Sequence, residues 1–277
     1  MIECEKKGGG EMRLVCPVCG EKLNRTDRSF VCPNRHSFDM ARQGYVNLLT
    51  VQQKHSKNPG DTREQVLSRR EFLEAGYYAP IARTLIETAK ELGISGEILD
   101  VGCGEGYYSA QLADALGAAL TGLDISKEAV RCAAAKYKGK QWLCATAAHI
   151  PVEDENAELV TSLFALTLPE EFRRVLMPGG YYFQVLAAQD HLLGLKSIIY
   201  DQLNFKEKDT VPDLPGFERV QSIPIRFPFT VEGQQIQNLF SMTPHVVRIG
   251  KDGAERLRKT QTLTDTASCV LNVFRRT

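Results

Sequence analysis

Residues 99–106 read Leu-Asp-Val-Gly-Cys-Gly-Glu-Gly, and this stretch decides the expected fold. The preceding segment, Glu97–Val101, has the length and hydrophobicity of a short buried strand, and a helical pattern at Tyr107–Leu116 follows it. The glycines let the backbone turn tightly and approach a ligand without a Cβ clash. The loop between this strand and helix is therefore predicted to hold a bound molecule.

The spacing of the glycines indicates which molecule. A dinucleotide-binding loop has Gly-x-Gly-x-x-Gly, whereas Gly102, Gly104 and Gly106 form Gly-x-Gly-x-Gly, with Asp100 two residues ahead. This form resembles motif I of class I S-adenosylmethionine-dependent methyltransferases. A second predicted strand ends at Asp124, whose carboxylate is expected to accept hydrogen bonds from both ribose hydroxyls of the cofactor.

Two later segments follow in the order typical of such enzymes. Residues 144–151, Cys-Ala-Thr-Ala-Ala-His-Ile-Pro, fall where such enzymes have a loop that contacts the adenine of the cofactor. Thr146 stands where many of these enzymes carry Asp, and Ala147 retains a possible backbone contact. Residues 177–181, Met-Pro-Gly-Gly-Tyr, match the turn before the fifth strand. The cofactor-binding interpretation thus rests on several motifs in sequence.

Strand and helix patterns alternate around these motifs. The predicted strands are Glu97–Val101, Leu120–Asp124, Trp142–Ala145, Leu159–Phe164 and Tyr181–Leu186, and the predicted helices are Tyr107–Leu116, Lys127–Tyr137 and Glu170–Leu176. A helical pattern from Thr62 to Leu92, broken at Gly76, precedes them. Regular βα alternation implies a parallel, doubly wound sheet, so the expected fold is α/β and Rossmann-like.

Four residues near the N-terminus form a second motif. Cys16, Cys19, Cys32 and His36 stand as Cys-x2-Cys, twelve intervening residues, then Cys-x3-His, the spacing of a tetrahedral zinc site. Four protein ligands leave no open position for a substrate, so the predicted role is structural. The nearby apolar residues are too few for a core of their own, and the metal is expected to supply folding energy. The remaining five of the eight cysteines are scattered, as free thiols are.

Composition and charge narrow the function classes. The chain has 277 residues and zero formal net charge, which argues against a generally basic nucleic-acid coat. Residues 1–70 nevertheless carry thirteen Lys and Arg against eight Asp and Glu, which hints that this part meets an anion. Basic residues around the metal ligands are candidates for phosphate contacts: Arg13, Lys22, Arg25, Arg28, Arg35 and Arg42. No apolar run approaches the roughly 18 residues of a membrane span and no signal core is visible, so we expect a cytoplasmic protein.

The whole chain resembles the bacterial 23S rRNA (guanine-N1)-methyltransferases of the RlmA type. The resemblance lies in the metal motif and the run His-Ser-Phe-Asp-Met-Ala-Arg-Gln-Gly-Tyr-Val-Asn-Leu-Leu at 36–49. It continues in Asn-Pro-Gly-Asp at 58–61, Arg-Arg-Glu-Phe-Leu at 69–73, Ala-Gly-Tyr-Tyr at 75–78, the stretch 100–108, and Met-Thr-Pro at 242–244. It implies methyl transfer from S-adenosylmethionine to N1 of a guanine in hairpin 35 of 23S rRNA, by a homodimer whose zinc domains help to form the RNA cleft.

The resemblance also assigns site residues. It implies that Tyr78, the loop positions Tyr108 and Ser109, and His191 contact the cofactor. The family typically shows Tyr-Ala-Pro after the fourth strand, whereas this chain has Phe-Ala-Leu at 164–166. Class I enzymes place groups that hold the target base there, so this departure bears on the choice of guanine.

The reaction requires loss of the N1 proton from a guanine taken from a loop or unpaired. His149, Asp154 and His191 are the candidates for accepting or relaying that proton, and solvent is the alternative. We expect a zinc-binding RNA-recognition domain at 1–50, a linker and cofactor-lid segment at 51–80, and a methyltransferase domain at 81–277. Two other functions stay open: methylation of a small molecule, and zinc-dependent RNA binding on a vestigial methyltransferase fold.

Overall fold

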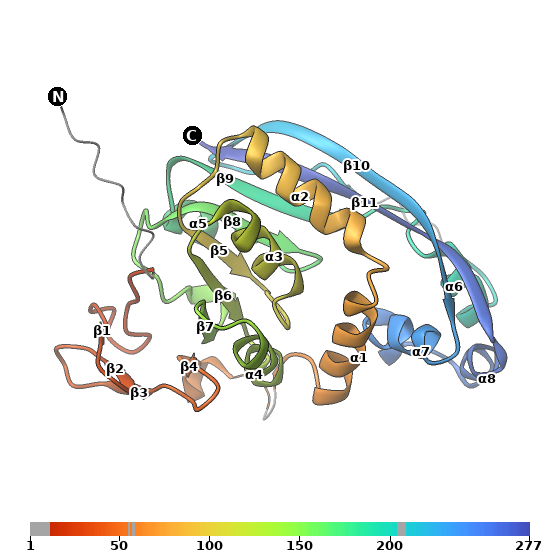
Figure 1. Cartoon of the computed structure of the whole chain (residues 1–277), viewed down its shortest axis with the longest axis horizontal. Helices are drawn as coiled ribbons and strands as arrows, with labels where there is room; N and C mark the ends of the chain where they lie inside the picture. The colour runs from red at the N-terminus through yellow and green to blue at the C-terminus, as the bar shows by residue number, and fades with distance from the viewer. Residues whose placement is uncertain (1–11, 55, 57–58, 204–208) are drawn as a thin grey trace.

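The computed structural model describes residues 12–54, 56, 59–203 and 209–277. Cys4, one of the cysteines expected to be a free thiol, and Asn58 of the Asn-Pro-Gly-Asp run lie outside these residues. A large sheet runs through the molecule, the zinc-motif segment lies at one end, and helices α6, α7 and α8 lie at the other (Figure 1). No helix in the described ranges has the length and apolar character needed to cross a membrane.

The large sheet has eight strands in the order β10-β11-β9-β8-β5-β6-β7-β4. The strands are β4 (Tyr45–Asn47), β5 (Ile98–Val101), β6 (Leu120–Asp124), β7 (Gln141–Cys144), β8 (Ala157–Leu163), β9 (Leu176–Ala187), β10 (Phe217–Glu232) and β11 (Thr262–Arg276). From β4 to β9 all neighbours are parallel, as the βα alternation predicts. The α/β, Rossmann-like fold class is confirmed.

The C-terminal edge of the sheet corrects the all-parallel prediction. Strand β11 pairs antiparallel with both β9 and β10. The βα alternation on which the prediction rests ends with β9, and antiparallel neighbours need no crossover helix between them. The sheet is therefore mixed, with a long antiparallel pair extending beyond its parallel centre (Figure 1).

The predicted helices agree with the structure to within two residues at each end. They are α1 (Arg63–Glu74), α2 (Ala79–Glu91), α3 (Tyr107–Leu116), α4 (Lys127–Lys136) and α5 (Pro169–Val175). Three helices for which the sequence carried no prediction follow: α6 (Leu193–Ile199), α7 (Gln234–Ser241) and α8 (Lys251–Lys259). The expected break at Gly76 separates α1 from α2, and this glycine has a φ of 85°. Residues 177–180, predicted as a turn before the strand, lie within β9 as a bulge: the register against β8 shifts there, and Gly179 has a φ of 76°.

The two faces of the sheet are covered by different parts of the chain. Ile98 of β5 packs in the buried cluster that includes residues of α2, α3 and α4. Its neighbour Leu99 points to the opposite face, because successive strand residues alternate. There it shares a buried cluster with α5 and with Leu14, Leu23 and Phe30 of the zinc-motif segment. That segment thus covers part of this face of the sheet.

Strand pairing also connects the zinc-motif segment to the sheet. It contains a small antiparallel sheet of β1 (Asn24–Arg25), β2 (Ser29–Val31) and β3 (Ser37–Asp39). Leu14 forms a bridge with Val152, and β4 pairs with β7 as the edge strand of the large sheet. The division of the chain into domains at residue 50 stays a prediction. Strand β4 lies before this boundary, yet it is hydrogen-bonded to β7 in the methyltransferase part. The short helix η1 (Val51–Gln53) begins the connection to α1.

Candidate functional site

A cavity of about 1470 Å³ opens at the carboxyl ends of the parallel strands, where open α/β sheets bind ligands. The glycine loop 102–105 and Asp124 form one end of its lining, with Thr146 and Ala147 from the loop after β7. Residues of α6 and of the segment around η3 (Pro244–Val247) form the opposite wall. The motifs that the sequence orders along the chain therefore meet in one cavity.

The glycine loop is held by the carboxylate of Asp124. Its Oδ2 accepts a hydrogen bond from the backbone N–H of Gly104 at 2.9 Å, and its Oδ1 accepts one from Ser126 N–H at 2.7 Å. Each carboxylate oxygen has a second lone pair, so Asp124 keeps the capacity to accept from ribose hydroxyls. Gly106 has a φ of 84°, and a Cβ there would lie 2.6 Å from the Trp142 ring. The third glycine is thus required for packing of the loop against β7.

Burial changes the ionisation of the acids around this loop. Asp100 is 3% exposed and accepts a 2.6 Å hydrogen bond from Thr161, yet burial raises its pKa to about 6. Burial also raises the pKa of Glu105 to about 7, against the opposing charge of Arg69. The pKa of Asp124 is raised by burial too, while the N–H groups of Ser126 and Gly104 oppose the shift. A cationic ligand in this cavity would favour the ionised form of all these acids.

Two tyrosines that line the cavity have buried hydroxyls without a hydrogen-bond partner in the described part of the chain. Tyr78, which is 2% exposed, and Tyr108 both line the cavity. Desolvation raises the pKa of each hydroxyl. An unpaired buried hydroxyl costs free energy, and a polar ligand in the cavity would remove that cost. These tyrosines therefore fit a cofactor such as S-adenosylmethionine.

The other predicted site residues are distributed differently. His191 lines the cavity, and its Nδ1 accepts a hydrogen bond from Ser268 N–H at 3.1 Å. Ser109 is 1% exposed on α3 and is not among the residues that line the cavity. His149 is exposed on η2 (Ala147–His149), and Asp154 forms a 2.8 Å ion pair with Arg174. Of the three candidate proton acceptors, the structure brings His191 to the cavity and leaves the other two outside its lining.

Sequence reasoning missed several residues that line the cavity. Gly60, Asp61 and Arg69 reach it from the segment before α1 and from α1 itself, and Lys196, Tyr200, His245 and Arg248 reach it from the opposite wall. Tyr200 Oη and His245 Nδ1 are hydrogen-bonded at 2.9 Å. The helical period of α1 and the Gly-Asp turn before it predict a helix start, but neither predicts which helix face meets the cofactor loop.

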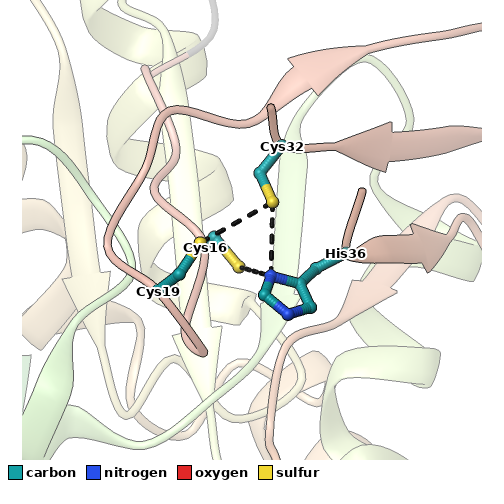
Figure 2. Close-up of side chains that lie close together, drawn as sticks. All are labelled: Cys16, Cys19, Cys32 and His36. Atoms are coloured by element: carbon teal, nitrogen blue, oxygen red, sulfur yellow. Dashed lines mark hydrogen bonds between the residues drawn. The ribbon is translucent and has the colours of Figure 1, made fainter. Parts of the chain in front are cut away.

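The predicted metal ligands form a compact cluster (Figure 2). The ligand atoms of Cys16, Cys19, Cys32 and His36 all lie within 4.8 Å of one another. His36 Nδ1 is 3.3 Å from Cys32 Sγ and 3.5 Å from Cys16 Sγ, and the sulfurs of Cys19 and Cys32 are 3.7 Å apart. A tetrahedron with zinc–ligand bonds of about 2.3 and 2.0 Å has edges of about 3.8 Å between sulfurs and about 3.5 Å from sulfur to nitrogen. The donor set fits zinc bound through Nδ1 of the histidine.

Comparison with known proteins agrees with both sites. Residues 14–57 match the model of the RlmA N-terminal zinc ribbon, and residues 99–184 match that of a methyltransferase domain. A Streptomyces fradiae protein named 23S rRNA (guanine(748)-N(1))-methyltransferase is 37% identical, over 66% of this chain and 66% of its own. A Micromonospora griseorubida protein, provisionally named a 23S rRNA (guanine-N(1)-)-methyltransferase, is 35% identical over 72% of both chains. The structure of a Haemonchus contortus phosphoethanolamine N-methyltransferase in complex with S-adenosyl-L-methionine aligns with a TM-score of 0.45 at 13% identity, over 78% of this chain and 57% of its own.

The mixed sheet, the glycine loop and the cavity define a class I methyltransferase, an enzyme that uses S-adenosylmethionine as its cofactor. A zinc ribbon, with zinc as its metal, precedes this fold. At the level of the particular family, the chain belongs to the 23S rRNA (guanine-N1)-methyltransferases of the RlmA type.

Proposed function

We propose that this protein transfers a methyl group from S-adenosylmethionine to N1 of a guanine in hairpin 35 of 23S rRNA. The observation that carries the proposal is the joining of two sites on one sheet. The cofactor cavity opens at the carboxyl ends of the strands of this sheet, and the zinc ribbon packs against one face of the same sheet. Relatives that match about two thirds or more of this chain are named for rRNA guanine-N1 methylation. Cytoplasmic location follows from a ribosomal RNA substrate.

Residues of the cavity would hold the cofactor in a defined orientation. All of the following line the cavity: Gly104 and Asp124 would bind the ribose, Thr146 and Ala147 would contact the adenine, and the hydroxyls of Tyr78 and Tyr108 would bind polar groups of the cofactor. Asp100 lies in β5 just before the loop and accepts a hydrogen bond from Thr161, and Ser109 of α3 lies beside the same carboxylate. When bound, the sulfonium supplies an activated methyl group. The chain's own contribution is to hold the guanine in line with that group and to exclude water.

The hydrogen bond of His191 bears on the fate of the N1 proton. Because Nδ1 accepts from Ser268 N–H, the neutral ring carries its proton on Nε2. In that tautomer the ring donates a hydrogen bond, for which the guanine O6 is a suitable acceptor. We propose that His191 orients the base through such a hydrogen bond and that the N1 proton leaves to solvent.

The zinc ribbon would supply RNA contacts. Arg28 and Arg35 are exposed on this segment, whereas Arg13 forms a 2.6 Å ion pair with Glu153. Exposed guanidinium groups are suited to phosphate contacts. We also propose the homodimer of the family, with the two zinc ribbons forming the RNA cleft, and the functional division into residues 1–50, 51–80 and 81–277.

Methylation of RNA in vitro tests this function. Purified protein with labelled S-adenosylmethionine should methylate 23S rRNA or a hairpin-35 fragment, and mass spectrometry should place the methyl group on guanine N1. Gly104→Val, which fills the cofactor loop, is the inactive control. A protein that binds cofactor but leaves both RNAs unmodified would overturn the substrate assignment. Methylation of metabolite extracts instead would favour a small-molecule substrate, and absence of cofactor binding would favour a purely RNA-binding role.

A further inference from the structure

Three cationic side chains line the cavity in the part of the chain that the structure describes, and they lie at different places. Lys196 belongs to α6 and Arg248 follows η3, so both lie on the wall opposite the glycine loop. Arg69 of α1 lies beside the loop itself: one of its guanidinium nitrogens is 3.7 Å from the position that a Cβ on Gly104 would occupy. Its side chain is 25% exposed. Arg69 thus lies against the cofactor loop, where its charge opposes the raised pKa values of Glu105 and Asp124.

The segment before α1 holds Arg69 in this position. Arg69 forms an ion pair with the carboxylate of Asp61. The backbone oxygen of Asp61 accepts a 2.8 Å hydrogen bond from the Ser126 hydroxyl, two residues beyond Asp124. Gly60 packs so closely there that a Cβ on it would lie 2.8 Å from Ser126 Cβ. The turn at 60–61 is therefore fixed against the loop after β6, and it orients the guanidinium.

The charge of this end of the cavity matches only part of the cofactor. Four carboxyl groups gather here: Asp61, Asp100, Glu105 and Asp124. They suit the sulfonium and the ammonium group of S-adenosylmethionine, but they repel its carboxylate. Arg69 is the group at this end that can offset that repulsion, and a guanidinium can donate two parallel hydrogen bonds to a carboxylate.

We propose that Arg69 binds the carboxylate of the methionine part of S-adenosylmethionine, with Asp61 as its positioning residue. Arg69 has donors in excess of those that one carboxylate partner uses, so it can pair with Asp61 and with the ligand together. The cofactor would then hold α1, and with it the connection from the zinc ribbon, against the methyltransferase core. The inference rests on the cofactor assignment and is independent of the RNA substrate.

Calorimetry with two ligands tests the proposal without RNA. S-adenosylhomocysteine carries the carboxylate, whereas 5′-methylthioadenosine lacks the whole amino-acid part. Arg69→Met should weaken S-adenosylhomocysteine binding about tenfold or more and leave 5′-methylthioadenosine binding unchanged. Arg69→Lys should show an intermediate loss, because it keeps the charge but not the fork of donors. Arg70→Met is the matched control, since the neighbouring Arg70 faces Glu74 at 3.7 Å, away from the cavity; it should bind both ligands as the parent does.

Each other outcome counts against the proposal. Equal weakening of both ligands in Arg69→Met would mean that Arg69 only maintains the shape of the cavity. Unchanged binding of both would mean that the carboxylate lies elsewhere. If Arg69→Met does not fold, as judged by circular dichroism, the decision passes to Arg69→Lys: it must lose affinity for S-adenosylhomocysteine alone. Failure of the parent protein to bind either ligand would instead overturn the cofactor assignment itself.

Discussion

Glu105 lies between two glycines of the cofactor loop and is 4% exposed. Burial raises its pKa from an ordinary 4.5 to about 7. In the cofactor-free protein, the carboxyl group of Glu105 therefore stays protonated in the folded state between pH 4.5 and 7, whereas it is ionised in the unfolded state over the same range. The free energy of unfolding should fall as the pH rises through this window, because the ionised carboxylate is disfavoured in the folded protein.

The variant Glu105→Gln should remove this pH dependence. We expect it to match the parent near pH 4 and to be more stable by up to about 3 kcal/mol at pH 8, since the amide carries no charge to desolvate. Urea denaturation of both proteins at several pH values measures the difference. Asp100, with its pKa raised to about 6, titrates in both proteins, and the comparison also removes the repulsion between its charge and that of Glu105. Stability curves that stay parallel from pH 4 to pH 8 would show that Glu105 is not buried as an acid.

At the scale of elements, the zinc ribbon and the cofactor cavity are separate. The metal ligands lie on a segment that packs on one face of the sheet through Leu14, Leu23 and Phe30. Among the described residues, none before Gly60 lines the cavity. Loss of the metal should therefore destabilise one layer of the molecule without changing the shape of the cofactor site.

Removal of zinc by a chelator should lower the melting temperature by about 5–10 °C. The affinity for S-adenosylhomocysteine at 20 °C should stay within about twofold, because the glycine loop does not depend on the ribbon. Metal analysis, calorimetry and thermal unfolding of the same sample give the zinc content, the affinity for S-adenosylhomocysteine and the melting temperature. If cofactor affinity collapsed together with the metal content, the ribbon and the cavity would form one cooperative unit.

At the scale of the whole molecule, we expect RNA binding to depend on the zinc ribbon and methyl transfer to depend on the cofactor cavity. Arg28 and Arg35 are exposed on the zinc ribbon, whereas Arg258 is exposed on α8 at the far end (Figure 1). The double variant Arg28→Glu, Arg35→Glu should bind a hairpin RNA about tenfold more weakly and with a smaller salt dependence, because it loses phosphate contacts. Fluorescence titration at two salt concentrations measures both effects.

Arg258→Glu changes the net charge in the same direction and is the control, with RNA affinity expected to change less than twofold. Binding of S-adenosylhomocysteine should be unaltered in both variants. A similar loss of RNA affinity in the Arg258 variant would indicate that overall charge, and not the ribbon, attracts the RNA.

Much of the core was predictable because its signals are local. The bounds of α3 and β6 agree with the predicted ones, since a glycine loop and a strand-ending Asp124 mark them in the chain. The metal cluster followed from short chelating pairs, whose members are close in sequence and hence in space. The antiparallel edge was not predictable in this way, because the register of β11 against β9 joins residues 82 to 94 positions apart.

The sequence by itself determined the class of fold, the order of the cofactor motifs and the four metal ligands, because each depends on residue types at short, fixed spacings. Only the tertiary structure decided that the zinc ribbon covers one face of the sheet, that His191 reaches the cavity while His149 and Asp154 do not, and that Arg69 lies beside the glycine loop. These facts depend on how helices and loops dock across the sheet. The position of each helix or loop on the sheet depends on the packing of many side chains from segments that are distant in the sequence, so a local sequence pattern does not predict it.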